Sequence, residues 1–384
     1  MAPSPDHHGS AVSSDMNRDA EYDLSDKDTE KQQEEKARPE YQDTFGDEEY
    51  AEVKYKVLSW CSIILLLGLG LLATYTGYTI GQFRWRYPHI QSMADAGEVL
   101  LGKFGREFLG TGQLLLVIFI MASHILTFTV AMNSITDHGT CSIVFGVVGL
   151  VISYILCLPR TSAKVSYLSI ASGHVAFFGF MSELKDPKEY PKSLFLLQGI
   201  DVILYVVTAV VIYYYAGQDV TSPALGSASP VVRKVAYGIA LPTIIIGGVV
   251  NGHVACKYVY VRLFRGSDRM HKKDLVATGS WVLLMLGLWI VAWVIAEAIP
   301  VFNNLLSLVA SLFASWFTYG LSATFWLYLN KDRLFATPMK IFLTILNVLI
   351  FAIAGCICGL GLYVSGKALH DDPSSASFSC ANNA

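Results

Sequence analysis

Long apolar runs that contain no charged residue are the feature that most constrains this chain. Leu275–Ala296 and Ile341–Val364 each hold more than 20 consecutive residues without Asp, Glu, Lys or Arg. About 20 such residues are enough for an α-helix to cross the hydrocarbon layer of a bilayer. A transmembrane β-barrel is excluded, because its roughly 10-residue strands would alternate apolar and polar residues. The sequence therefore predicts an all-α polytopic membrane protein whose first partner is the lipid bilayer.

Eight strong apolar segments can be recognised. The composition agrees with a membrane protein, since 53% of the 384 residues are hydrophobic and only 15% are charged. The predicted spans are Val57–Ile80, Thr111–Ile135, Thr140–Leu158, Leu194–Tyr215, Val235–Val261, Leu275–Ala296, Val301–Leu329 and Ile341–Val364. A ninth segment, Val165–Met181, is weaker. One soluble core could not bury this much apolar surface, so a soluble globular domain is not expected.

Basic residues recur on alternate loops, which the positive-inside rule assigns to the cytoplasm. The alternation fails around the first span and around Val165–Met181, because each has Lys or Arg at both ends. Either conflict disappears if one crossing is absent at that place. We interpret Val165–Met181 as the start of one helix joined to the end of another. A re-entrant or interfacial segment is the alternative, since irregular segments occur inside transporters.

Charge divides the chain into three parts. Residues 1–56 hold 16 Asp or Glu and 7 Lys or Arg, so this end is strongly acidic. It is too polar to bury a core, and we expect residues 1–50 to be a disordered cytoplasmic tail. Residues 51–364 form the predicted transmembrane domain, and residues 365–384 form a short polar C-terminal tail.

The sequence offers little support for other chemistries. Most of the seven cysteines lie in apolar runs and are interpreted as small hydrophobic residues, so no disulfide is expected. No metal site and no cofactor are predicted, and the scattered basic residues do not indicate nucleic-acid binding. An enzyme is not expected, because G-x-S-x-G, HExxH and P-loop motifs are absent.

The stretch "IALPTIIIGGVVNGHVACKY" places a proline, glycines and two polar side chains in one span. Pro242 removes a backbone donor, and glycines weaken the helix. Asn251 and His253 lie at a similar depth, and together with freed backbone groups they could bind the carboxylate or amino group of a substrate. The alternative is a kinked packing helix whose glycines mark close contacts.

Two further ionisable residues lie inside predicted spans. His124 in "IMASHILTFTVAMNS" could carry a proton, since an unperturbed histidine titrates near pH 6.5. A hydrogen-bonded structural role is its alternative. Asp201 in "LFLLQGIDVILYVV" could also carry protons, although it could equally lie near the cytoplasmic interface.

Three longer strings carry a family resemblance: "LLATYTGYTIGQF", "GHVAFFGFMSELKDPKEYPKSLFLLQGID" and "GGVVNGHVACKYVYVRLF". They resemble the amino acid/auxin permease family, and most of all its fungal neutral amino acid permeases, from about Glu49 to Val364. The resemblance implies eleven helices in a leucine-transporter-like inverted-repeat bundle. It further implies secondary active import of neutral or aromatic amino acids, with protons favoured over sodium. We expect the plasma membrane rather than the vacuolar membrane.

The resemblance also assigns site residues. The string "SGHVAFFGFMSELKDP" is similar to the end of the sixth helix of the family, whose unwound centre borders the substrate. By this likeness Ser172, Gly173 and His174 lie near the substrate. Thr111–Ile135 and Val235–Val261 correspond to the third and eighth helices, which face the central cavity.

The chain departs from the family at two places. A first helix is missing before "CSIILLLGLGLLATY", and "SYLSIAS" joins directly to "GHVAFFGF", so that most of helix five and half of helix six are absent. About nine of eleven helices would remain. Helices one and six hold the substrate in this fold, so an inactive truncated isoform or gene-model product is the alternative hypothesis, with a role as regulatory partner of a full-length permease.

Overall fold

The computed structural model describes residues 48–159, 177–178, 181, 184, 186–216, 224–264, 274–299, 301–371 and 377–382. The acidic tail predicted for residues 1–50 lies almost wholly outside them. The chain divides into two units, Met1–Ile63 and Ile64–Ala384. In the first unit, the described residues form the beginning of helix α2, and the second unit contains everything considered below.

The described residues form helices and no strands. The helices are α2 (Glu48–Arg86), α3 (Met93–Thr136), α4 (Ser142–Cys157), α6 (Tyr190–Ala216), α7 (Pro230–Phe264), α8 (Leu275–Ala298), α9 (Phe302–Val309), α10 (Leu321–Leu329) and α11 (Pro338–Asp371), with short 3-10 helices η2 (Pro187–Glu189) and η4 (Ala224–Ser227) and the π-helix η6 (Ala310–Gly320). Seven of the described helical segments are long and apolar enough to cross a membrane, and α4 is a shorter apolar helix. The all-α polytopic membrane architecture is confirmed. Seven of the eight strong predicted spans coincide with these helices, and the eighth, Thr140–Leu158, contains the shorter helix α4. Val165–Met181 lies mostly outside the described residues.

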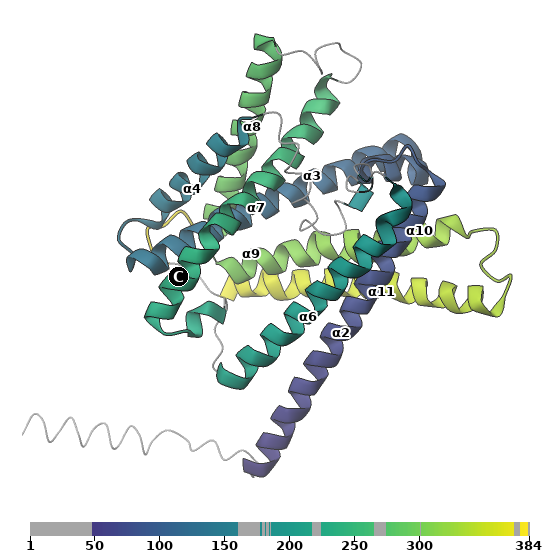
Figure 1. Ribbon diagram of the computed structural model, residues 1–384, viewed down its shortest axis with the longest axis horizontal. Helices are drawn as coiled ribbons and strands as arrows, with labels where there is room; N and C mark the ends of the chain where they lie inside the picture. Colours follow the sequence, from purple (N-terminus) through teal and green to yellow (C-terminus); the bar gives the residue numbers. More distant parts are fainter. Residues whose placement is uncertain are drawn as a thin grey trace, which may run out of the picture. The chain divides into compact units, whose positions relative to one another are not determined.

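Four helices make the most extensive helix packing in the second unit. Helix α3 packs against α4, α7 and α8, and these three also pack against one another (Figure 1). We call α3, α4, α7 and α8 the scaffold. Its centre contains large side chains that are fully buried, including Met121 of α3 and Met285 and Trp289 of α8. Close packing of this kind holds membrane helices together, since lipid is as apolar as the side chains that meet.

A second group is formed by α9, η6 and α10, which follow one another along the chain and pack against α11. Helix α2 joins this group through aromatic and polar contacts. The rings of Phe83 and Phe325 stack with their centroids 4.4 Å apart. Asn347 of α11 donates a hydrogen bond of 2.7 Å from Nδ2 to the hydroxyl of Tyr75.

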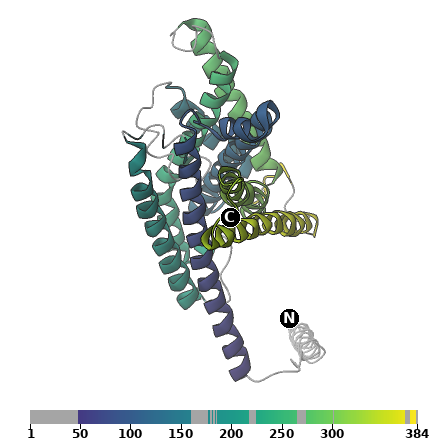
Figure 2. The same ribbon diagram turned by 90° about the vertical axis from the view of Figure 1, so that its right-hand side faces the viewer.

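Helices α2 and α6 lie side by side in both views (Figures 1 and 2). The Tyr190 hydroxyl at the start of α6 donates to the carbonyl of Gly77 at 2.9 Å. A Cβ atom on Gly70 would lie only 2.6 Å from Val202, so the two helices also approach closely further along. From Phe195 to Tyr215, however, no residue of α6 is buried among the described residues. Apart from its contact with α2, this length of α6 is therefore largely exposed in the part of the chain that the structure describes.

Helix α3 contains a sharp interruption that the sequence did not predict. Leu101 and Gly102 depart from helical geometry, and Gly102 has φ of +63°, a conformation that glycine adopts most readily. The preceding helical stretch begins at Met93, and Ser92 just before it forms a capping box with Asp95. The chain folds back at the interruption, so that Gly97 and Gly105 meet backbone to backbone.

Helix α7, in contrast, continues through Pro242 from Pro230 to Phe264. Of the two interpretations that the sequence left open for this stretch, the continuous helix agrees with the packing helix rather than with backbone groups freed by a break. Pro242 still leaves the carbonyl of Gly238 without its usual helical donor. One missing hydrogen bond is tolerated because the remaining backbone bonds and the packing of the following turns keep the helix intact.

A disulfide bond joins Cys141 to Cys380 across 239 residues of sequence, and the expectation of no disulfide is therefore wrong. The error has a simple cause. The predicted span Thr140–Leu158 placed Cys141 inside an apolar helix, whereas α4 begins only at Ser142. Cys141 is thus in the turn before the helix, where it can meet a distant part of the chain.

The contact between Gly97 and Gly105 yields a stability prediction. Gly105→Ala should lower the melting temperature of the detergent-solubilised protein, because the new Cβ would overlap the backbone carbonyl of Gly97. A cost of about 1–3 kcal/mol is expected for overpacking of this kind. Gly279→Ala on α8 is the matched control, since no atom lies within 4 Å of its added Cβ. Equal melting temperatures for the two variants would contradict the close approach.

Candidate functional site

Three glycines of α7 face the other scaffold helices. A Cβ on Gly247 would lie 2.6 Å from Cε1 of His124, which comes from α3. Added Cβ atoms on Gly248 and Gly252 would both lie 3.2 Å from the indole of Trp289, which comes from α8. Because these glycines have no side chain, α7 can approach α3 and α8 closely. This supports the alternative interpretation, in which the glycines mark packing contacts between helices.

His124 of α3 and Asn251 of α7, two of the predicted site residues, both contact Gly247 of α7. The half-buried His124 ring lies over Gly247 and makes a hydrogen bond with the backbone of Ile244. Asn251 is 5% exposed, and its Nδ2 donates to the carbonyl of Gly247 at 2.9 Å. The fold therefore brings a histidine and an amide together around Gly247.

His253 lies two residues further along α7 and faces α4 instead. Its Nδ1 is 2.9 Å from the carbonyl oxygen of Val249, and its Nε2 is 3.0 Å from that of Pro159. Only a doubly protonated ring could donate to both oxygens. The thiol of Cys157 also donates to Val249, at 3.4 Å. His253 thus connects α7 to the end of α4, and its ring nitrogens are both engaged by protein groups.

Asp201 is not near His124 or Asn251 in the contacts of the described residues. It is partly exposed on α6, eleven residues after Tyr190. At 1.5 Å per residue this separation is about 17 Å, roughly half the thickness of the hydrocarbon layer. The helix begins earlier than Leu194, the predicted start, so Asp201 lies deeper in its helix than the sequence suggested. The other predicted residues, Ser172, Gly173 and His174, lie outside the described residues.

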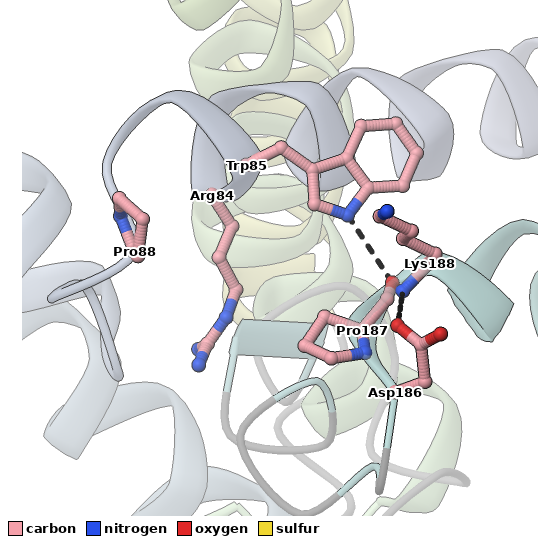
Figure 3. Close-up of a pocket in the computed structure, with 6 residues that line it drawn as sticks. All are labelled: Arg84, Trp85, Pro88, Asp186, Pro187 and Lys188. Carbon is pink, nitrogen blue, oxygen red and sulfur yellow. Dashed lines mark hydrogen bonds between the residues drawn. The ribbon is translucent and has the colours of Figure 1, made fainter.

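An open groove of about 570 Å³ lies where α2 ends next to η2 (Figure 3). It is lined by Arg84, Trp85, Pro88, Asp186, Pro187 and Lys188. The Trp85 indole donates to the carbonyl of Pro187 at 3.1 Å. Nη1 of Arg84 lies 2.6 Å from the carbonyl oxygens of Ile90 and Phe178, and the side chain is buried. The arginine therefore joins chain segments here, and this groove is not our candidate for the substrate site.

Glu297 is a buried carboxylate that the sequence analysis overlooked. It lies near the end of α8 and is 7% exposed, and one of its oxygens faces Gly146 of α4. The indole of Trp293 is close to the same glycine, with Nε1 3.2 Å from the position of an added Cβ. The signal that could have found it is an acidic residue at the end of an otherwise uncharged span.

The apolar helices, the glycine contacts between them and the buried polar groups define an integral membrane protein of the helical-bundle class. The chain belongs to the family described as "Transmembrane amino acid transporter protein", which matches residues 57–173 and 172–366. The predicted family resemblance is confirmed. Membership indicates a transporter of amino acids rather than an enzyme.

Fungal relatives support this assignment. The N amino acid transport system protein of Neurospora crassa is 33% identical over 367 residues, with 80% of this chain and 78% of the relative covered. A transmembrane transporter of Gibberella moniliformis is 27% identical over 322 residues, with 69% and 68% covered. One of Fusarium pseudograminearum is 26% identical over 336 residues, with 72% and 71% covered.

The alignment lengths reveal a gap. Since 80% of 384 residues is about 307, roughly 60 of the 367 positions aligned with the Neurospora protein have no counterpart in this chain. The family match is also in two parts, and these parts meet at residues 172–173. That meeting point is the join between "SYLSIAS" and "GHVAFFGF".

The contact between Gly247 and His124 gives a second prediction. Gly247→Ala should lower the melting temperature, because its Cβ would force the His124 ring out of its position between α3 and α7. Gly238→Ala, on the same helix, has no atom within 4 Å of the added Cβ and should stabilise the helix by up to about 1 kcal/mol. Thermal unfolding of both purified variants tests this difference in sign. Stabilisation by Gly247→Ala would show that α3 does not approach α7 here.

Proposed function

We propose that the chain performs secondary active import of neutral or aromatic amino acids by alternating access. Family membership carries this proposal, and the pairing of His124 with Asn251 around Gly247 supports it. An amide and an imidazole in an apolar bundle can hydrogen-bond the carboxylate and amino groups of a bound amino acid. Ser172, Gly173, His174 and His253 are proposed to complete the substrate site.

Coupling to protons, rather than to sodium, is part of the same proposal. His124 and Asp201 are the proposed proton carriers, because ionisable groups inside membrane spans are costly and often serve such roles. His124 lies at the contact of α3 with α7, and Asp201 lies about halfway along α6. Protonation of either group could therefore be linked to movement between helices.

The plasma membrane is the proposed location. The Cys141–Cys380 disulfide supports it, since disulfides persist where a protein surface meets an oxidising exterior. The turn that contains Cys141 also lacks Lys and Arg, as expected of an external loop.

A second candidate function is that of a transport-inactive form that regulates a full-length permease. The two-part family match and the roughly 60 unaligned positions favour it, because the missing stretch would include part of the substrate site. The exposed length of α6 also favours it, since from Phe195 to Tyr215 no residue of this helix is buried by the part of the chain that the structure describes.

Uptake by the purified chain in proteoliposomes decides between these functions. A transporter should accumulate labelled neutral amino acids under an inward proton gradient, and a protonophore should abolish the accumulation. Asn251→Ala should reduce initial uptake by about tenfold, equivalent to about 1.4 kcal/mol, while Gly238→Ala should retain it. A requirement for sodium would contradict proton coupling.

The absence of uptake by a chain that elutes as one folded species would contradict the transport proposal. In that case the regulatory candidate predicts co-purification with a full-length fungal permease of the family and a lowered uptake by that permease. Failure of both results would eliminate the second candidate as well.

A further inference from the structure

The last described residues of the chain are fastened to the scaffold at several points. Cys380 forms the disulfide with Cys141, directly before α4. The Ser142 hydroxyl, at the first residue of α4, donates to the carbonyl of Ala381 at 2.5 Å. Ser377 donates from its hydroxyl to the carbonyl of Ala298 at 2.8 Å. Residues 377–381 therefore contact both α4 and α8, and this segment is drawn in yellow near α4 in Figure 1.

Ser377 and Phe378 donate hydrogen bonds to backbone carbonyls at the end of α8. The last carbonyls of a helix have no intrahelical donor. The backbone N–H of Phe378 donates to the carbonyl of Glu297 at 3.1 Å, and the Phe378 ring lies edge-on to Trp293 at 6.4 Å. Phe378 has φ of +55°, which is uncommon for a residue with a bulky side chain. Such a conformation persists only where surrounding contacts enforce it.

We propose that Ser377–Ala381 is a disulfide-locked strap that closes the outer ends of α4 and α8. The strap covers the region of Glu297 and Trp293, whose side chains lie over Gly146. It holds the end of the chain, which follows α11, on the scaffold. Because α11 belongs to the second helix group, the strap restrains this group relative to the scaffold.

The Cys141–Cys380 disulfide requires an even number of membrane crossings between its two cysteines, because both must lie on the same face of the membrane. Between Cys141 and Cys380 the described chain has five segments long enough to cross a membrane, in α6, α7, α8, the continuous α9–η6–α10 segment and α11. We count the shorter apolar helix α4 as a further crossing, which gives six. An even number returns the chain to its starting face, as the disulfide requires. Pro159 and Asp186 therefore lie on the same face, opposite the strap.

Most of the loop charge agrees with this assignment, and the exceptions are Arg233 and Lys234 at the start of α7, on the strap side, where Lys234 pairs with Asp137. Arg84 and Arg86 at the end of α2, Arg262 near the end of α7, and Lys331 and Arg333 after α10 all lie at helix ends opposite the strap. The positive-inside rule assigns these ends to the cytoplasm. The strap then faces the oxidising side, where a disulfide is stable.

Cleavage of the full chain tests the bond directly. A protease site inserted between α7 and α8 should give two fragments that remain joined on a thiol-trapped, non-reducing gel and separate after reduction. Cys380→Ser should give separate fragments under both conditions. Separation of the wild-type fragments without reductant would overturn the strap. Reduction should also lower the melting temperature of the uncleaved wild type, and should leave that of Cys380→Ser unchanged.

Labelling of intact cells with a membrane-impermeant maleimide tests on which face of the membrane the strap and Lys188 lie. In a Cys141→Ser background, Cys380 should react from outside without permeabilisation. In a cysteine-free background, Lys188→Cys should react only after permeabilisation, because it lies beside Asp186 on the inner face. External labelling of Lys188→Cys would overturn the assignment of faces. Failure of external labelling at Cys380, together with labelling after permeabilisation, would overturn the location of the strap.

Discussion

The close approach of α7 to α3 and α8 is the contact on which the scaffold depends. In a bilayer, lipid tails compete equally with apolar side chains, so helices associate where small residues allow their backbones to approach. Gly247 receives the ring of His124, while Gly248 and Gly252 receive the indole of Trp289. The polar groups proposed to serve transport are held by the same contacts. Packing and chemistry are therefore inseparable here, since a larger residue at Gly247 would displace the histidine before it affected any substrate.

The sequence predicted the helices well because spanning a bilayer demands length and apolarity, which are local properties. Each strong span is a helix, and the glycines of α7 were correctly identified as candidate close contacts. Features that depend on distant residues were missed. The interruption at Gly102 is stabilised by the contact of Gly97 with Gly105, and Cys141 finds Cys380 only after the chain has folded. For the proposed site, the sequence selected Asn251 and His124 as candidates, but it could not show that both contact Gly247.

Pro242 illustrates how tertiary packing overrides a local signal. Proline inside a helix usually kinks or ends it, and the sequence therefore left open both a break that frees backbone groups and a kinked packing helix. The break occurs elsewhere, at Gly102 in α3, where the positive φ makes a regular helix impossible. Helix α7 remains continuous because its following turns are fixed against three neighbours. The polar residues Asn251 and His253 consequently project from a regular helix, on which their spacing of two residues directs them to different partners.

The uncovered length of α6 and the packed scaffold can coexist for a physical reason. In water, an apolar helix without neighbours would destabilise the whole protein, because its exposed surface costs about 25 cal/mol for each Å². In a bilayer the same surface is solvated by lipid, and the loss is confined to the packing contacts that are missing. The scaffold contact of Gly247 with His124 joins the two matched parts of the chain, and the contact of Gly252 with Trp289 lies within the second part, so neither contact involves the unaligned stretch. Loss of transport and retention of a folded scaffold are therefore compatible, and the strap from Ser377 to Ala381 would reinforce that scaffold in either case.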